Sequence, residues 1–156
     1  MNILTINSGS SSLRLAKFSF IEGVWTVLAR EKVGNCNGAQ ERILQEFVGD
    51  CEDSDIGAVI HRFVHGGNVF STPCVLSRKD RMELEKLSPL APLHNPAALL
   101  WLDAAANLFP DTTKQIAVFD TMLYSKLSDV VITYGLPYEL CLNHGLRRFG
   151  FHGLAH

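Results

Sequence analysis

The first 33 residues hold three strand-like segments in succession, and this opening constrains the fold more than any other feature. Residues 2–7 form a short apolar run, and residues 12–20 and 25–33 alternate between apolar and polar side chains. Short turns separate the segments, so neighbouring strands are expected to run antiparallel. Helical and strand-like segments then follow one another along the rest of the chain. The pattern predicts an α/β fold with a mixed sheet flanked by helices.

Helical spacing and turn residues locate the later elements. Asn95 and Pro96 form a strong helix start, because asparagine caps a helix and proline suits its first position. Pro110 ends that helix. After the opening strands we expect a helix over 39–48, a strand over 56–64, helices over 79–87 and 95–109, a strand over 115–119, and a loosely α/β ending over 130–134 and 137–144.

Composition and charge narrow the class of partner. A chain of 156 residues, 47% hydrophobic and 19% charged, suffices for one domain with a real core and is too apolar for disorder. The net charge is −2 without any block of like charge, which argues against nucleic acid, because a phosphate backbone requires clustered cations. No apolar run reaches the ~18 residues of a membrane span, and no leader pattern follows Met1. We expect a soluble, cytoplasmic protein that binds a small molecule or another protein.

Four cysteines are spread along the chain: Cys36, Cys51, Cys74 and Cys141. They form no CxxC pair and have no metal-ligand spacing to a histidine. A chain with this much apolar content does not need a disulfide framework, so we expect reduced thiols.

Small polar residues fill the turn after the first strand, from Asn7 to Ser12. Such a turn exposes backbone N–H groups and hydroxyls that together are able to cradle a phosphate, although no GxxxxGK[ST] loop is present. Turn propensity alone favours an ordinary polar hairpin. This segment by itself leaves both interpretations open.

An arginine lies within the strand expected over 56–64. A period of two puts Arg62 and Val64 on one face. This pair suits a short carboxylic acid, since a guanidinium binds the carboxylate and a branched side chain takes the alkyl end. The alternative is a local ion pair of Arg62. His61 and His65 fall on the opposite face, and we expect them to be structural.

Three further positions have the chemistry of a ligand site. His94 lies beside a helix N-terminus, which attracts anions, or it is merely packed there. Asp120 ends a buried strand, where open α/β sheets place ligands and metals, or it caps a helix. His152 is flanked by glycines, which packing explains poorly.

Taken in order, these segments resemble the successive signature segments of the acetate kinase family. The matching stretches are INSGSSSLR, HRFVHGG, LAPLHNPA, AVFDT and LPYEL followed by RRFGFHG, and they extend from Asn7 to the end of the chain at His156. The resemblance implies a ribonuclease H-like fold, shared with actin-like and sugar-kinase ATPases. It also implies reversible transfer of the phosphoryl group of ATP to acetate or propionate, yielding ADP and acetyl phosphate from acetate. The implied cofactor is Mg²⁺, and the implied full-length enzyme is a homodimer.

The resemblance assigns four residues to the phosphate side of the site. Asn7 would contact the magnesium and phosphate end. Ser10 and Ser12 would shape the loop that binds the nucleotide phosphates. Arg14 stands where the family usually has lysine, and it would approach the same phosphates.

Four more residues are implied to bind the acid. Arg62 would bind the substrate carboxylate, with Val64 and Leu93 lining a small pocket for its methyl group. His94 would support the site.

Two residues are implied to be catalytic: Asp120, and His152, which would stabilise the transferring phosphoryl group. Acetate titrates roughly where side-chain carboxyls do, near pH 4–5, so it needs no general base at neutral pH. We therefore expect Asp120 to act mainly by holding magnesium or its waters, while Arg62, His152 and the metal neutralise charge.

The chain departs from the family pattern at three residues and in length. Leu154 and Ala155 replace two hydroxyl residues of the usual GFHGTSH ending, and Tyr124 stands where a histidine is usual. Family members are much longer, so residues 1–156 are expected to be the N-terminal ribonuclease H-like domain without the second ATPase domain. We expect this chain alone to be inactive. The alternative is a non-catalytic module that binds a small carboxylate, phosphate or a partner.

Overall fold

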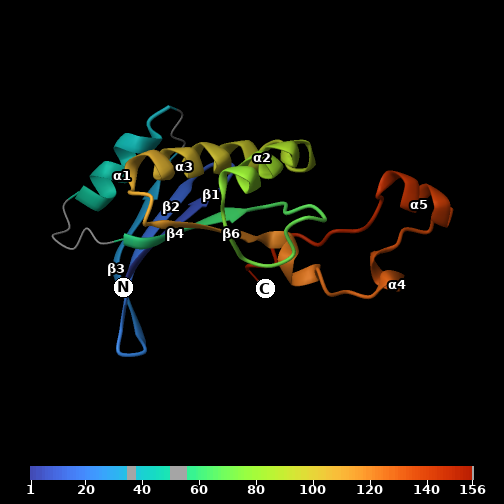
Figure 1. Ribbon diagram of the computed structural model, residues 1–156, viewed down its shortest axis with the longest axis horizontal. Coiled ribbons are helices and arrows are strands. Elements are labelled where there is room, and N and C mark those ends of the chain that lie inside the picture. The colour runs from blue at the N-terminus through green and yellow to red at the C-terminus, as the bar shows by residue number, and fades with distance from the viewer. Residues whose placement is uncertain (35–37, 50–55, 156) are drawn as a thin grey trace.

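The computed structural model describes residues 1–34, 38–49 and 56–155. These residues form one six-stranded sheet in the order β3-β2-β1-β4-β6-β5 (Figure 1). The strands are β1 (Asn2–Ser8), β2 (Leu13–Ile21), β3 (Val24–Val33), β4 (Ile56–Phe63), β5 (Cys74–Val75) and β6 (Lys114–Phe119).

The sheet is mixed, as the sequence predicts. β1, β2 and β3 form the antiparallel meander, and β4 and β6 continue the sheet parallel to β1. The tight turn between β2 and β3 has positive φ at Glu22 (50°) and Gly23 (82°), which matches the twist of a two-residue hairpin. The two-residue strand β5, which sequence periodicity did not indicate, pairs antiparallel with β6. This strand arrangement is that of the ribonuclease H-like fold expected above.

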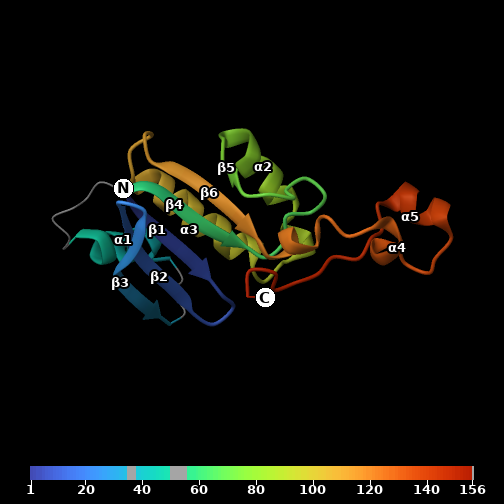
Figure 2. The same ribbon diagram turned by 90° about the horizontal axis from the view of Figure 1, so that it is seen from below.

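Three helices pack on one face of the sheet: α1 (Gln40–Gly49), α2 (Arg78–Lys86) and α3 (Asn95–Leu108) (Figure 1). Their positions confirm the predicted helices to within one or two residues. Figure 2 views the molecule from below, where β4 lies in front of α3. That face of the meander carries no helix from the described part of the chain.

The start of α3 corrects one local prediction. His94, not Asn95, is the N-cap, and Asn95 is the first helical residue. The buried Asn95 amide instead donates to the backbone oxygen of His65 (2.9 Å) and accepts from its backbone N–H (3.2 Å). Both polar groups of the amide are satisfied by the chain beyond β4, so Asn95 fixes that chain against α3 rather than capping its own helix.

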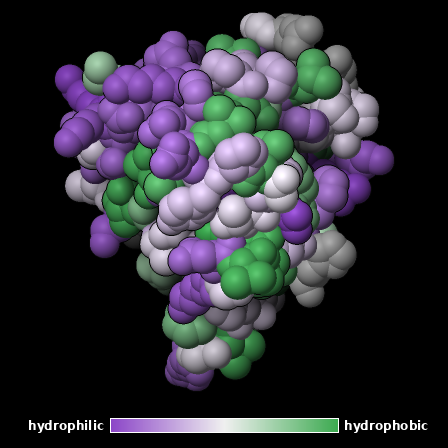
Figure 3. Space-filling model, turned by 90° about the vertical axis from the view of Figure 1, so that its right-hand side faces the viewer, coloured by the Kyte–Doolittle hydropathy of each residue, from purple (hydrophilic) through white to green (hydrophobic). Residues whose placement is uncertain are grey.

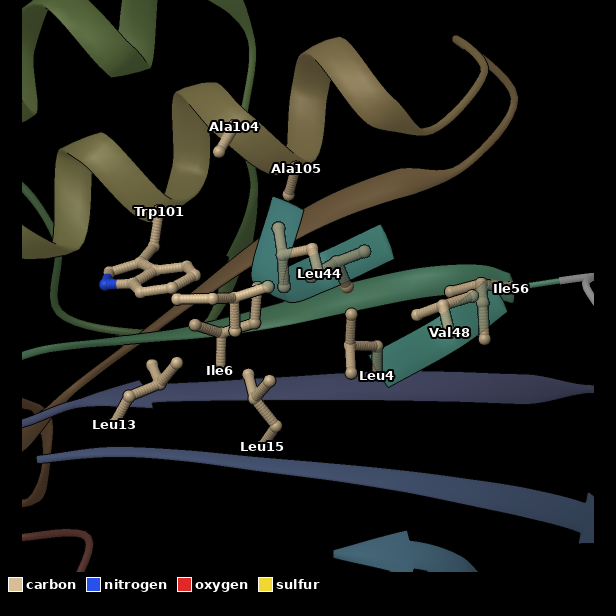
Figure 4. Close-up of a cluster of buried hydrophobic side chains, with 12 residues drawn as sticks. Leu4, Ile6, Leu13, Leu15, Leu44, Val48, Ile56, Trp101, Ala104 and Ala105 are labelled. Atoms are coloured by element: carbon tan, nitrogen blue, oxygen red, sulfur yellow. The ribbon is translucent and has the colours of Figure 1, made fainter. Parts of the chain in front are cut away.

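Two clusters of buried side chains join the helices to the sheet. In the first, Figure 4 shows Leu4 and Ile6 of β1 facing Leu44 of α1 and Trp101 of α3. The second lies closer to the carboxyl ends of β4 and β6, where Phe63 and Phe119 are fully buried with their rings 5.9 Å apart. Burying one such side chain stabilises a fold by about 1.5–3 kcal/mol. This second cluster fixes the strand ends from which the candidate site projects.

The chain after β6 extends away from the sheet (Figure 1). It comprises a 3-10 turn over Asp120–Tyr124 and two short helices, α4 (Asp129–Ile132) and α5 (Tyr138–His144). The region is therefore helical rather than mixed, and Figure 3 shows hydrophobic side chains exposed on this side of the molecule.

Cys74 and Cys141 are free thiols, while Cys36 and Cys51 lie outside the described residues. Among the described helices, none has the length and hydropathy needed to cross a membrane.

Candidate active site

Three polar side chains meet at the carboxyl ends of the parallel strands. Arg62 is the penultimate residue of β4, Asp120 directly follows β6, and Asn7 lies near the end of β1. Arg62 donates from Nε to Asp120 Oδ1 (2.9 Å), from Nη2 to Asp120 Oδ2 (2.6 Å), and from Nη1 to Asn7 Oδ1 (3.0 Å). One guanidinium thus joins three strands at the edge where open α/β sheets place ligands.

The ion pair between Arg62 and Asp120 is largely buried, unlike a contact between two charges on the surface. The Asp120 side chain is 0% exposed, and that of Arg62 is 24% exposed. The hydrogen bonds to Asp120 raise the pKa of Arg62 above its ordinary value, against the opposing effect of burial. Arg62 therefore stays charged, and the two-pronged geometry fixes the plane of its guanidinium.

His152 lies beside this pair on a tight turn. Its Nδ1 is 3.9 Å from Asp120 Oδ2, and its side chain is 73% exposed. The backbone of His152 has φ of 60°, and the N–H of the next residue, Gly153, donates to the backbone oxygen of Asp120 (3.1 Å). A Cβ at Gly153 would lie 2.2 Å from that oxygen, so only glycine permits this approach. The structure brings His152, Asp120, Arg62 and Asn7 together.

If the chain belongs to a phosphotransferase, as its resemblance implies, we expect Gly153→Ala to lower the rate of the full-length enzyme by about tenfold or more, because the added Cβ would displace His152 from Asp120. Steady-state kinetics would measure the loss. Gly135→Ala is the matched control, since a Cβ at Gly135 meets no atom within 4 Å. Equal rates for the two variants would contradict a positioning role for the turn.

His65 supports the same turn, although the sequence indicated only a structural residue. The backbone N–H of Gly67 donates to its Nδ1 (2.9 Å), and its ring meets Phe149 and Phe151 edge-on at centroid distances of 4.5 and 5.8 Å. Burial lowers the pKa of His65. Phe149 and Phe151 lie three residues and one residue before His152, so His65 packs against the segment that carries His152. The density of aromatic residues and glycines in RRFGFHG was the only sequence signal for this packing.

His61 faces the helices, as its position in the strand predicts. It is 1% exposed, and its Nε2 donates to Gln115 Oε1 (2.7 Å), while its buried Nδ1 has no hydrogen-bond partner. Burial lowers the pKa of His61 to about 4. The ring is therefore neutral near pH 7 and does not titrate with the site.

Because His61 binds a proton more weakly when folded than when unfolded, stability should fall as the pH drops from about 6.5 to about 4. The expected contribution is about 3 kcal/mol in the free energy of unfolding. Urea denaturation at several pH values would measure it. His61→Gln should flatten this slope, whereas His144→Gln, at an exposed histidine, should not. An unchanged slope in His61→Gln would contradict the assignment.

The remaining predicted site residues make no hydrogen bond to this cluster in the described structure. Val64 is half-buried just beyond β4, and Leu93 is 77% exposed. His94 is half-buried, with a buried Nδ1 that has no partner. Ser10 is exposed and Ser12 half-buried in the turn after β1.

Arg14 occupies a different position from these residues. It is exposed on β2, directly across from Asn7 in the pairing of β1 with β2. It therefore lies one strand away from Asn7 on the helix-free face of the sheet.

The oxygen donors of the site fit a magnesium ion held together with a substrate. Within the described residues, no group of three or more His, Cys, Asp or Glu side chains converges as a metal cage. Mg²⁺ is usually bound by one or two carboxylates plus substrate phosphates and waters. Asp120 and Asn7 supply one carboxylate and one amide oxygen, and both contact the same guanidinium.

The chain thus has a ribonuclease H-like fold with a cluster of charged and polar side chains at one edge of its sheet. Within that class, the chain belongs to the acetokinase family, whose model matches residues 19–156.

Individual relatives agree with this assignment. The chain is 40% identical over 177 residues to an acetate kinase of Pseudarthrobacter chlorophenolicus, covering 100% of the chain and 44% of that protein. Its fold matches the crystal structure of Porphyromonas gingivalis acetate kinase with a TM-score of 0.80 and 34% identity, covering 99% of the chain and 46% of that structure. A propionate kinase from Francisella tularensis matches with a TM-score of 0.78, 29% identity and the same two coverages. The chain thus spans less than half the length of these relatives.

Proposed function

We propose that residues 1–156 are the N-terminal domain of a phosphotransferase that moves the phosphoryl group of ATP to a short-chain carboxylate. With acetate the products are acetyl phosphate and ADP, and the reaction is reversible. The observation that carries the proposal is the Arg62 guanidinium held between Asp120 and Asn7, beside His152. The family membership of the chain supports the same chemistry.

In this proposal Arg62 binds and orients the acid. The buried Asp120 carboxylate accepts from two N–H groups along one edge of the guanidinium, so the remaining N–H groups are presented in a fixed direction. A carboxylate oxygen of acetate forms the new bond to the γ-phosphorus as the bond to the ADP oxygen breaks. Acetate is already ionised near pH 7, so no residue has to remove a proton.

Val64, Leu93 and His94 are proposed to complete the acid side of the site. Val64 lies just beyond β4, two residues after Arg62, and this position suits contact with the alkyl group of the acid. An apolar pocket distinguishes acetate from propionate by only about 1–3 kcal/mol per methylene, so both acids remain candidate substrates.

The phosphate side is proposed to consist of the turn after β1 and the histidine turn. Ser10, Ser12 and Arg14 are proposed to bind the nucleotide phosphates, and His152 to stabilise the transferring phosphoryl group. Asn7 and Asp120 would hold Mg²⁺, which when bound neutralises phosphate charge. These residues lie at one sheet edge, where fixed charges act on developing negative charge.

A second ATPase domain is proposed to complete the enzyme, which acts in the cytoplasm as a homodimer. The coverage of less than half of each relative supports a further domain. Closure of two domains excludes water and adds charged groups, and one such group changes rates by orders of magnitude. We therefore expect the isolated chain to form no acetyl phosphate.

The test joins residues 1–156 to the part of Porphyromonas gingivalis acetate kinase that the chain does not cover. The fused enzyme should form acetyl phosphate from ATP, Mg²⁺ and acetate, trapped with hydroxylamine, while the isolated chain should not. Turnover by the isolated chain would contradict its incompleteness. Binding of acetate and phosphate by a folded but inactive fused enzyme would favour the alternative, a non-catalytic binding module.

A further inference from the structure

We propose that Tyr124 is a positioning residue, which holds His152 beside Asp120 by packing against the segment that carries the histidine. The proposal rests on the proposed function, since the role of His152 in phosphoryl transfer is itself proposed. Tyr124 is not expected to contact a substrate. It acts through Gly150 and the backbone of Phe151, two residues of that segment.

The position of His152 has to be fixed through its backbone. The side chain is 73% exposed, and the distance of 3.9 Å from its Nδ1 to Asp120 Oδ2 is too long for a hydrogen bond. The backbone at His152 has φ of 60°, in the left-handed region that residues other than glycine rarely adopt. Such a conformation persists only where the surrounding structure enforces it.

The peptide groups on either side of His152 are both held by the 3-10 turn that follows β6. The group before it contains the backbone oxygen of Phe151, which accepts from the hydroxyl of Tyr124 (3.3 Å). The group after it contains the N–H of Gly153, which donates to the backbone oxygen of Asp120 (3.1 Å). Because peptide groups are planar, fixing the two planes around a residue fixes its φ and ψ. The turn thus sets the direction in which the His152 side chain projects.

The ring of Tyr124 makes a closer contact with the same segment. A Cβ at Gly150 would lie 2.1 Å from Tyr124 Cδ2, and its three nearest atoms all belong to the Tyr124 side chain. Gly150 does not have a positive φ, so its backbone alone would permit a side chain. The ring of Tyr124 is what requires glycine at this position.

The ring is expected to contribute more than the hydroxyl. The hydrogen bond from Tyr124 to Phe151 measures 3.3 Å, and an O–H···O bond usually measures about 2.5–3.0 Å. Phenylalanine at position 124 should therefore keep most of the effect, and alanine should lose it.

The alternative is that Tyr124 merely stabilises the fold. Against it, Tyr124 belongs to neither of the two buried clusters described above. Its contacts with Gly150 and Phe151 lie two residues and one residue before His152. Loss of the ring should therefore loosen this segment and leave the core intact.

Hydrogen exchange followed by NMR tests the positioning in this chain. Tyr124→Ala should speed exchange of the Gly153 N–H by about tenfold, because the segment opens more often. The N–H of Val59, within β4, should exchange as before. Tyr124→Phe should stay within about threefold of the unchanged chain. The matched control is Tyr138→Ala, at a tyrosine of α5 that is 65% exposed, and it should leave the Gly153 N–H unchanged.

Kinetics of the fused enzyme supply a second measurement. Tyr124→Ala should lower kcat by about tenfold and change KM for acetate by less than about twofold, since a displaced His152 weakens the transfer step and leaves Arg62 in place. Gly150→Ala should cause a similar loss, because its Cβ would collide with the ring. The two substitutions combined should cost no more than Tyr124→Ala alone, because the smaller side chain leaves room for the Cβ.

Three results would overturn the proposal. One is exchange of the Gly153 N–H within about twofold of the unchanged chain in Tyr124→Ala. Another is equal acceleration at Gly153 and Val59, because Tyr124 would then stabilise the whole fold. The third is a loss of kcat that multiplies when Tyr124→Ala and Gly150→Ala are combined.

The proposed function is tested separately by turnover of the unsubstituted fused enzyme. If that enzyme were inactive while exchange at Gly153 still depended on Tyr124, the positioning of His152 would stand and only the phosphotransferase would be refuted.

Discussion

Replacing Arg62 with alanine should lower acetyl phosphate formation by the fused enzyme by about 100-fold or more. The variant removes the cation that would bind the acid and share the charge of the transferring phosphoryl group. It also leaves Asp120 without its two side-chain hydrogen bonds to the guanidinium. Steady-state kinetics with acetate as the varied substrate would show the loss in both kcat and kcat/KM. Near-normal turnover and affinity would refute the role of Arg62.

The same substitution should destabilise the isolated chain. Removing one partner of a buried ion pair costs about 3–5 kcal/mol, since the remaining charge is left uncompensated. The matched control is Arg42→Ala, whose partner Glu46 is on the surface of α1, with side chains 73% and 67% exposed. An exposed helical pair contributes only about 0.3–0.5 kcal/mol. Urea denaturation of both variants would measure the difference, and similar midpoints would contradict the buried ion pair.

Asp120→Asn should reduce the rate of the fused enzyme by about 100-fold and weaken its dependence on magnesium, because an amide is a poorer ligand for a hard cation than a carboxylate. Asparagine keeps one acceptor for Arg62, so the fold should be retained. A magnesium titration at saturating ATP and acetate would report the shift in the metal concentration needed for half-maximal rate.

The control for Asp120→Asn is Asp129→Asn, at an exposed residue in the first turn of α4. It removes the same charge away from the proposed metal site and should leave the magnesium titration unchanged. If Asp120→Asn kept its magnesium titration but shifted the pH–rate profile, Asp120 would act in proton transfer instead.

The main elements of the fold could be predicted because their signals are local. Alternation along β2 and helical spacing in α1 follow from which side chains face the core. Strand β5 was not predicted because two residues carry no period. The residues of α4 and α5 are mostly exposed, so no buried stripe distinguished helix from strand there.

The site could be predicted only in part, because its geometry depends on contacts between distant segments. The period of two along a strand predicted that Arg62 and His61 face opposite sides of the sheet, and the structure agrees. The sequence also predicted that Asp120 follows the end of a buried strand, which is where it lies. Nothing local indicated that Arg62 would bind Asp120 in a two-pronged pair or bridge to Asn7. The close approach of Gly153 to the Asp120 backbone was likewise invisible, since it depends on where the chain returns after α5.

The long sequence separations within the site also have a consequence for how the chain folds. Asn7 and Arg62 are 55 residues apart, and Arg62 and Asp120 are 58 apart, whereas β1, β2 and β3 pair through short turns. Closing long loops costs entropy before any contact compensates for it, so the meander should form early and the parallel strands β4 and β6 should join later. Destabilising substitutions at Arg62 and Asp120 should then mainly speed unfolding, and those within the meander should slow refolding. The binding groups would thus come together only in the last stage of folding, and a chain arrested earlier would expose the meander without a site.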